Sequence, residues 1–261
     1  MPENMPSLTW VFLRGLTRES RHWGQFLDEF AQTLPGSRVL ALDVPGNGRL
    51  NALPSPTRVP LMVAHCRTQL ALRQVSGPVR LLGMSLGAMV AVAWSQAHPQ
   101  EVASQVLINT SLRPFNPFYQ RLKPASYGVL LRLLLSRAGD EAWERAVLRL
   151  TSHHGSKKPE AVLSHWLALR AANPVSPANA ARQLLAAARF RASARSPAVP
   201  TLLLASENDS LVSVNCSKTL ARRWHTPLHL HPSAGHDLPL DDGPWVALQV
   251  RAWLAGQPPL H

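Results

Sequence analysis

The sequence predicts an α/β fold, with a mostly parallel central sheet, helices on both faces and a helical insertion. Short apolar runs alternate with amphipathic segments over residues 8–111, and the same alternation returns over residues 198–256. Between them, residues 112–197 show helical periodicity without strand-like runs. Strands that alternate with helices form parallel sheets. We therefore expect residues 1–111 and 198–261 to form one core and residues 112–197 to form a helical lid.

The first part of the core is predicted to alternate strictly between strand and helix. Short apolar runs bounded by polar or glycine-containing loops are typical of buried parallel strands. Apolar residues at helical spacing between these runs predict the connecting helices. In chain order, the expected elements are a strand at 8–14, a helix at 23–34, a strand at 38–42, a helix at 60–75, a strand at 79–82, a helix at 88–98 and a strand at 102–109.

The insertion is predicted to be helical before the alternation resumes. Proline, glycine, asparagine and serine separate its helical segments. Its helices are expected at 127–137, 141–151, 159–172 and 177–191. The core then continues with a strand at 199–205, a helix at 215–224, a strand at 227–231, a loop at 232–242 and a helix at 244–255. A helical insertion beyond the carboxyl edge of such a sheet usually covers the ligand crevice.

Composition excludes several classes of protein. With 261 residues and 46% apolar residues, the chain suits one large globular domain with an insertion. No run of about 18 apolar residues occurs and residues 1–7 do not have the pattern of a signal peptide, so no membrane span and no export are expected. Cys66 and Cys216 predict buried free thiols in a reducing compartment, hence a cytoplasmic protein. No metal-ligand spacing occurs, and neither metal nor cofactor is expected.

The chain is strongly basic, with a formal net charge of +12. A basic surface attracts acidic proteins, nucleic acids or anionic surfaces. Arginine supplies nearly all of the charge, since lysine occurs only at positions 123, 157, 158 and 218. No basic run interleaved with aromatic residues marks a nucleic-acid groove, so we expect no nucleic-acid partner.

The most informative motif is G-x-S-x-G at residues 83–87, which lies between a predicted strand and a predicted helix. In this setting the serine occupies a sharp turn that exposes its hydroxyl at the carboxyl end of the strand. Gly83 and Gly87 lack a Cβ, which lets the strand and the helix approach each other closely. Ser85 is therefore the predicted nucleophile. The motif alone is weak, because it also requires a base, an acid and two oxyanion donors elsewhere in the chain.

The base and the acid are expected in the two last loops of the core. His236 follows the last predicted strand, where a base belongs if the chain order is serine, acid, histidine. The loop after the strand at 199–205 offers Asp209 and Glu207, of which Asp209 is preferred because it lies deeper in the loop. Asp43 is a weaker alternative, because the Pro-Gly that follows it suggests a structural turn. Other histidines, which more often belong to the surface or the core, occur at 153, 154, 165, 229 and 231.

Two backbone N–H groups are expected to stabilise the oxyanion. Leu86 follows the nucleophile and supplies one of them from the start of the helix. The second is expected from Leu16, in the loop after the first strand, where Gly15 allows the turn. Because the donors are backbone N–H groups, both positions require a particular direction of the N–H bond rather than a particular side chain.

With these loops in this order, the chain resembles the α/β-hydrolases over roughly residues 8–111 and 198–256. Among them it is similar to small bacterial carboxylesterases, including esterases that demethylate pimeloyl-carrier-protein methyl esters. The resemblance implies a serine hydrolase that cleaves a carboxylic ester with a short or medium acyl chain through an acyl-enzyme. The chain departs from the family at the oxyanion loop, where Arg14 replaces the usual histidine, and after the elbow, where Ala88 replaces a glycine.

Several alternatives stay open on the sequence alone. One is hydrolysis of a thioester, an amide or a C–C bond, and another is a non-catalytic ligand-binding member of the fold. A third alternative follows from the resemblance. It is an esterase that acts on an acyl chain carried by an acidic acyl-carrier protein, which the arginines of the lid would contact. Arginines of the expected lid occur at 113, 121, 132, 137, 145, 149, 170, 182, 189, 191 and 195, against acidic residues at 140, 141, 144 and 160.

Overall fold

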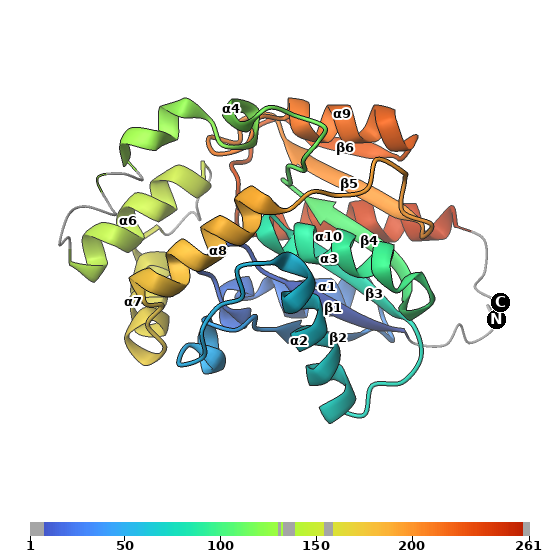
Figure 1. The fold of residues 1–261 in the computed structure, drawn as a ribbon, viewed down its shortest axis with the longest axis horizontal. Helices are drawn as coiled ribbons and strands as arrows, with labels where there is room; N and C mark the ends of the chain where they lie inside the picture. The colour runs from blue at the N-terminus through green and yellow to red at the C-terminus, as the bar shows by residue number, and fades with distance from the viewer. Residues whose placement is uncertain (1–7, 130–131, 133–138, 154–158, 258–261) are drawn as a thin grey trace.

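A parallel sheet forms the centre of the molecule (Figure 1). The computed structural model describes residues 8–129, 132, 139–153 and 159–257. Its sheet has the strand order β2-β1-β3-β4-β5-β6, and all neighbouring strands are parallel. The predicted fold class is therefore confirmed. The strands are β1 (Thr9–Leu13), β2 (Arg38–Leu42), β3 (Val79–Met84), β4 (Val102–Ile108), β5 (Thr201–Ser206) and β6 (Leu228–His231).

Helices cover both faces of the sheet because its strands are apolar on both sides. In β1, Trp10 and Phe12 pack against α1 and α10, whereas Val11 and Leu13 pack in the core formed with α2, α3 and α9. Side chains alternate between the two faces along a strand, so a fully apolar strand needs a helical layer on each side. The covering helices are α1 (Phe26–Thr33), α2 (Val59–Leu72), α3 (Leu86–Ala97), α9 (Asn215–Trp224) and α10 (Leu238–Ala255).

The helical segment between β4 and β5 lies at the end of the molecule toward which the strands run (Figure 1). Leu148, Leu163 and Trp166 form a small apolar cluster of its own. Its helices are α4 (Phe118–Arg121), α6 (Asp140–Thr151), α7 (Pro159–Ala172) and α8 (Pro177–Arg189). Most of the helix predicted at 127–137 lies outside the described residues. Among the described helices, none combines the length and the apolar character that crossing a bilayer would require.

The largest difference from the predicted boundaries, among the described elements, is at the start of the last helix. The residues at 232–242 were expected to be a loop, but α10 already begins at Leu238. Its first turn contains Pro239, a position where the missing N–H of proline is tolerated. Backbone angles at Asp242 (φ −153°, ψ 72°) then kink the helix before Pro244. The sequence pattern correctly marked a helical start at Pro244, but could not show the extra turn that precedes it.

The order of the strands brings two loops together at the centre of the sheet. The chain moves outward from β1 to β2 and then returns to β3 on the other side of β1. In such sheets, ligands bind outside the carboxyl ends of the strands, where the direction of winding reverses. The loops after β1 and β3 both begin at this point, since Leu13 lies beside Gly83 in the register.

Short 3₁₀ helices occur at Ser20–Trp23 (η1), Gly48–Leu50 (η2), Pro99–Glu101 (η3) and Pro124–Ser126 (η4).

Candidate active site

Ser85 occupies a strained turn between β3 and α3. Its backbone angles are φ 55° and ψ −116°, a conformation that costs a non-glycine residue about 1–3 kcal/mol. Its N–H donates to the carbonyl of Ile108 at 3.0 Å, which anchors the turn to the neighbouring strand. The residue is half-buried rather than sealed in the core. A strained, accessible serine at the start of a helix is the geometry that the G-x-S-x-G motif predicts.

The two glycines of the elbow, residues 83–87, are required by close backbone contacts. A Cβ on Gly87 would lie 2.0 Å from the carbonyl oxygen of Leu13 and 2.7 Å from that of Arg14. On Gly83 it would lie 2.6 Å from the carbonyl oxygen of Gly87. These neighbours are backbone atoms and cannot move aside like a flexible side chain. The first turn of α3 therefore packs directly against the end of β1.

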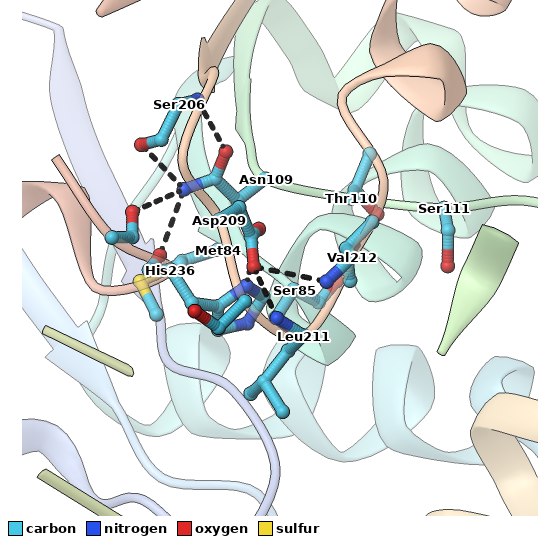
Figure 2. A network of polar contacts seen from close by, with 12 residues as sticks. Met84, Ser85, Asn109, Thr110, Ser111, Ser206, Asp209, Leu211, Val212 and His236 are labelled. Carbon is cyan, nitrogen blue, oxygen red and sulfur yellow. Dashed lines mark hydrogen bonds and ion pairs between the residues drawn. The ribbon is translucent and has the colours of Figure 1, made fainter. Parts of the chain in front are cut away.

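The structure brings Asp209 together with His236. The Asp209 carboxylate accepts a hydrogen bond from Nδ1 of His236 at 2.7 Å. Its other oxygen accepts the N–H groups of Leu211 and Val212 at 2.7 and 2.9 Å. Only 1% of Asp209 is exposed, whereas Glu207 in the same loop is exposed to solvent. Figure 2 shows the group that these residues form with Ser85.

His236 is buried, and its surroundings favour the charged form. Burial alone would lower the pKa of the imidazole, but the charge and hydrogen bond of Asp209, together with the charge of Asp237, raise it above the usual 6.5. Because the carboxylate can only accept, the proton of the neutral ring resides on Nδ1. Nε2 is then left as the atom that can receive a proton. This is the tautomer that a serine-activating base needs.

The expected oxyanion donors belong to two segments that lie next to Ser85. Leu86 is the first residue of α3, and the N–H groups of a first helical turn have no carbonyl partner within the helix. The loop after β1 also lies against the serine. A Cβ on Gly15 would lie 3.3 Å from the Cβ and 3.8 Å from the Oγ of Ser85. Leu16, the second expected donor, is the next residue of that loop.

Asn109 organises the site, a role that its residue type did not reveal in the sequence. It directly follows β4 and has a positive φ of 46°. Its Nδ2 donates to the carbonyls of Gly235 and His236 at 3.2 and 2.8 Å, and its Oδ1 accepts the N–H of Ser206 at 2.8 Å (Figure 2). One side chain therefore joins the loops that carry Asp209 and His236. In the sequence, this role could have been suspected only because a polar asparagine follows an apolar strand of the core.

The loop at residues 14–18, here called the oxyanion loop, is held by side chains that the sequence did not connect to it. Arg14 forms a buried ion pair with Asp237. The N–H of Thr17 donates to Oε1 of Gln183 in α8 at 2.8 Å. Arg18 pairs with Glu144 of α6 at 2.6 Å and lies over the ring of Trp166. In each case the partner is far away in the chain, and no sequence spacing relates the two.

The weaker candidates have other partners. Asp43 accepts the N–H groups of Ser20 and Arg49, so it closes a turn, as the following Pro-Gly suggested. His231 pairs with Asp242, and His229 contacts Gln249. His153 lies beside the site, where its ring contacts the carbonyl of Asn208 and the hydroxyl of Ser210, the two neighbours of Asp209 in the chain. His165 is exposed, and His154 lies outside the described residues.

A family model described as serine aminopeptidase, S33, matches residues 5–243. The chain belongs to this family. The predicted resemblance to the α/β-hydrolases is confirmed.

Two curated proteins are similar to the chain over part of their length. Both are biotin biosynthesis bifunctional proteins BioHC. The one from Cellvibrio japonicus is 28% identical over 86% of this chain and 43% of its own length. The one from Teredinibacter turnerae is 27% identical over 61% of this chain and 25% of its own length. The chain thus spans less than half the length of these relatives.

Solved structures of the same fold include several hydrolases. A putative lipase from Acinetobacter baumannii has a TM-score of 0.77 at 21% identity, covering 97% of this chain and 85% of its own. The enol-lactonase from Burkholderia xenovorans has a TM-score of 0.77 at 17% identity, covering 95% and 92%. An esterase from Thermogutta terrifontis has a TM-score of 0.73 at 21% identity, covering 95% and 89%. At these identities, the likeness establishes the fold.

Proposed function

We propose that the protein is a carboxylic ester hydrolase with a catalytic triad of Ser85, His236 and Asp209. The observation that carries the proposal is the 2.7 Å hydrogen bond from His236 to the buried Asp209, at the same edge of the sheet as the strained Ser85. The family supports hydrolysis. The ester is favoured by the resemblance to small carboxylesterases and by relatives that act in biotin biosynthesis.

The chemistry proceeds through an acyl-enzyme. Oγ of Ser85 attacks the ester carbonyl carbon while its proton passes to Nε2 of His236, and Asp209 holds the ring by its Nδ1–H. The negative oxygen of the tetrahedral intermediate accepts hydrogen bonds from the N–H groups of Leu16 and Leu86. When the C–O bond breaks, the alcohol leaves with the proton from His236. Water then repeats the sequence on the acyl-enzyme and releases the acid.

Residues 112–197 are proposed to form a lid over this site. The described part of this segment contacts the oxyanion loop from two helices, through Gln183 of α8 and Glu144 of α6. Its helices lie at the carboxyl end of the sheet, where a substrate must enter (Figure 1). The packing of these helices over Ser85 would then select the acyl chain. A short or medium chain is the expectation that we carry forward from the sequence.

The proposal is tested by hydrolysis of p-nitrophenyl acetate and butyrate. We expect Ser85→Ala to lower kcat by about 1,000-fold or more, since removing a triad member leaves only binding and oxyanion stabilisation. The matched control is His165→Ala, which alters an exposed histidine and should leave turnover unchanged. Hydrolysis that survives Ser85→Ala would refute the triad. An aminoacyl p-nitroanilide cleaved in preference to both esters would identify an amidase instead.

A fluorophosphonate probe separates catalysis from mere binding. It reacts covalently with an activated serine, so the wild-type protein should be labelled and Ser85→Ala should not. A protein that binds hydrophobic esters but resists the probe would be a non-catalytic member of the fold. A screen of acyl chain length would then define the substrate of the active enzyme.

A second candidate function is hydrolysis of an ester on an acyl chain attached to an acidic carrier protein. The BioHC relatives favour it. So does the charge of the lid, whose acidic residues Asp140, Glu141, Glu144 and Glu160 are all paired with arginines. Among the described residues, several arginines of this segment have no carboxylate partner; they are Arg113, Arg121, Arg149, Arg182, Arg189, Arg191 and Arg195.

Growth of a biotin-requiring strain tests this candidate. Complementation that depends on Ser85 would support it, and so would carrier-protein binding that weakens steeply as salt is added. Charge reversal at Arg182 and Arg189 of α8 should abolish complementation but leave hydrolysis of p-nitrophenyl butyrate unchanged. Failure to complement, together with full activity on small esters, would restrict the function to small-molecule esters.

The buried free thiols of Cys66 and Cys216 lead us to propose a cytoplasmic location.

A further inference from the structure

Arg14 contacts the residues next to His236 and Ser85 and an aromatic ring of η1. Its Nη1 and Nη2 donate to the two carboxylate oxygens of Asp237 at 3.0 and 2.5 Å. Asp237 is the residue after His236. Nη1 also lies 3.7 Å from the sulfur of Met84, the residue before Ser85. The guanidinium group lies 4.7 Å from the centre of the Trp23 ring.

This ion pair is almost completely removed from water. The side chains of Arg14 and Asp237 are 2% and 3% exposed. Burying two charges costs several kcal/mol per ion, and apolar side chains of similar volume often stabilise a fold at least as well. Stability alone is therefore a poor reason for this pair. Its location between the oxyanion loop and the loop of His236 offers a better one.

The backbone of Arg14 is also constrained by the elbow. Its carbonyl oxygen lies so close to Gly87 that no Cβ fits between them, and the next residue, Gly15, packs against Ser85. Any movement of the Arg14 side chain that pulled on this loop would move the proposed oxyanion donor Leu16. Asp237 is tied in turn to the chain on its other side, since its N–H donates to the carbonyl of Thr151 at 2.6 Å.

We propose that Arg14 is a positioning residue, which acts through its ion pair with Asp237 to hold the oxyanion loop and the histidine loop in register around Ser85. This inference rests on the proposed hydrolase function. The bidentate geometry suits the role, because two parallel hydrogen bonds fix the orientation of both planar groups. A single charged contact would fix only a distance.

The pair also balances the charge next to the base. The charged groups that face His236 are Asp209, Asp237 and Arg14. The carboxylate of Asp237 raises the pKa of His236, and the guanidinium of Arg14 lowers it. While both are present, their effects oppose each other. Removing either one leaves the other charge of the pair uncompensated beside the imidazole, and the two removals act in opposite directions.

The test is an NMR titration of His236 in four proteins: wild type, Arg14→Met, Asp237→Asn and the double variant. Arg14→Met should raise the pKa of His236 and Asp237→Asn should lower it, each by about 0.5–1 unit. The double variant should titrate close to the wild type. The resonance is assigned by its loss in His236→Gln. This readout does not require turnover, so it stands even if the proposed reaction is wrong.

Kinetics test the positioning itself. Arg14→Met should lower kcat of ester hydrolysis about 10-fold, with KM changed less than about twofold, because the loop moves but the acyl pocket does not. Arg14→Lys should recover part of the loss, since lysine keeps the charge but loses the bidentate contact. Arg67→Met is the matched control: it breaks the partly exposed ion pair with Glu101 and should change neither kcat nor the titration.

The outcomes separate this inference from the proposed function. Shifts of opposite sign in the two single variants support the charge balance beside His236, whether or not the esters are hydrolysed, and the loss of kcat in Arg14→Met supports the positioning role. Two shifts of the same sign, or shifts below about 0.2 pH unit in both variants, overturn the inference. An uncompensated charge at this short distance must change the pKa of His236. A melting temperature that falls while kcat and the titration stay constant also overturns it, because the pair would then be purely structural.

Discussion

The elbow and the oxyanion loop meet at Ser85, but they are held in place in different ways. The elbow, residues 83–87, is shaped by its own backbone, with two glycines at points where no Cβ fits and a serine at positive φ between them. The oxyanion loop, residues 14–18, depends on partners from elsewhere in the chain. These are Gln183 and Glu144 from the helical segment and Asp237 from the loop of His236.

This difference determines how each region responds to mutation. A loop defined by local backbone contacts tolerates almost no change at its glycines, because the atoms that would clash are carbonyl oxygens. A loop held by several side chains loses its supports one at a time, and each loss should cost a moderate amount. The same difference explains why the elbow is visible in the sequence as a motif and the supports of the oxyanion loop are not.

The largest effect is expected from Gly87→Ala. The added methyl group would lie 2.0 Å from the carbonyl oxygen of Leu13, so the first turn of α3 must move away from β1. A displacement of about 1 Å at the nucleophile can lower kcat about 100-fold, and we expect at least that loss on p-nitrophenyl butyrate. Gly139→Ala is the control, since no atom of the described residues lies within 4 Å of its added Cβ. Equal activity of the two variants would show that the elbow is not rigid.

A smaller but still large effect is expected from Glu144→Gln. The change leaves the buried guanidinium of Arg18 without its carboxylate, and breaking such a pair costs about 3 kcal/mol of unfolding free energy. Glu101→Gln weakens the partly exposed pair with Arg67 and should cost less than about 1 kcal/mol. Urea denaturation of both variants gives the comparison. Similar losses of unfolding free energy in the two variants would mean that the contact between α6 and the oxyanion loop stabilises the fold no more than a surface ion pair.

Gln183→Ala should lower both stability and catalysis. Its fully buried side chain binds Asn47 and Ser55 as well as the Thr17 N–H. Because Thr17 lies next to the proposed oxyanion donor Leu16, we expect kcat to fall about 10-fold. Asn179→Ala is matched to it on α8: Asn179 binds the loop at residues 51–55 and does not contact the oxyanion loop. That variant should lose stability but keep kcat. If both lose kcat equally, α8 supports the site only through its overall position.

The smallest effect concerns the pH profile of the wild-type enzyme. His236 must be neutral to accept the proton of Ser85, and its pKa in the folded protein is raised above 6.5. Activity should therefore rise with pH through this elevated value and be lost below it. The acidic limb of kcat/KM, measured between pH 5 and pH 9 in roughly half-unit steps, locates it. A midpoint below 6.5 would mean that burial outweighs the charge of Asp209.

Local sequence patterns were enough to predict the alternation of strands and helices, a serine at a strand-to-helix turn and the two loops in which Asp209 and His236 lie. These features depend on local patterns: apolar periodicity, glycines at a tight turn, and the order of loops after parallel strands. The extra first turn of α10 escaped the pattern, because Pro244 marked a start and gave no sign of the kink at Asp242.

The polar side chains that hold the candidate site together are visible in the folded molecule alone. Asn109 joins the loops of Asp209 and His236, and Arg14 joins the oxyanion loop to the loop of His236 through Asp237. Arg14 and Asp237 are 223 positions apart in the chain, so no local pattern relates them. The two charges can be buried only because the fold brings them to 2.5 Å of each other, and that proximity exists in the folded molecule alone.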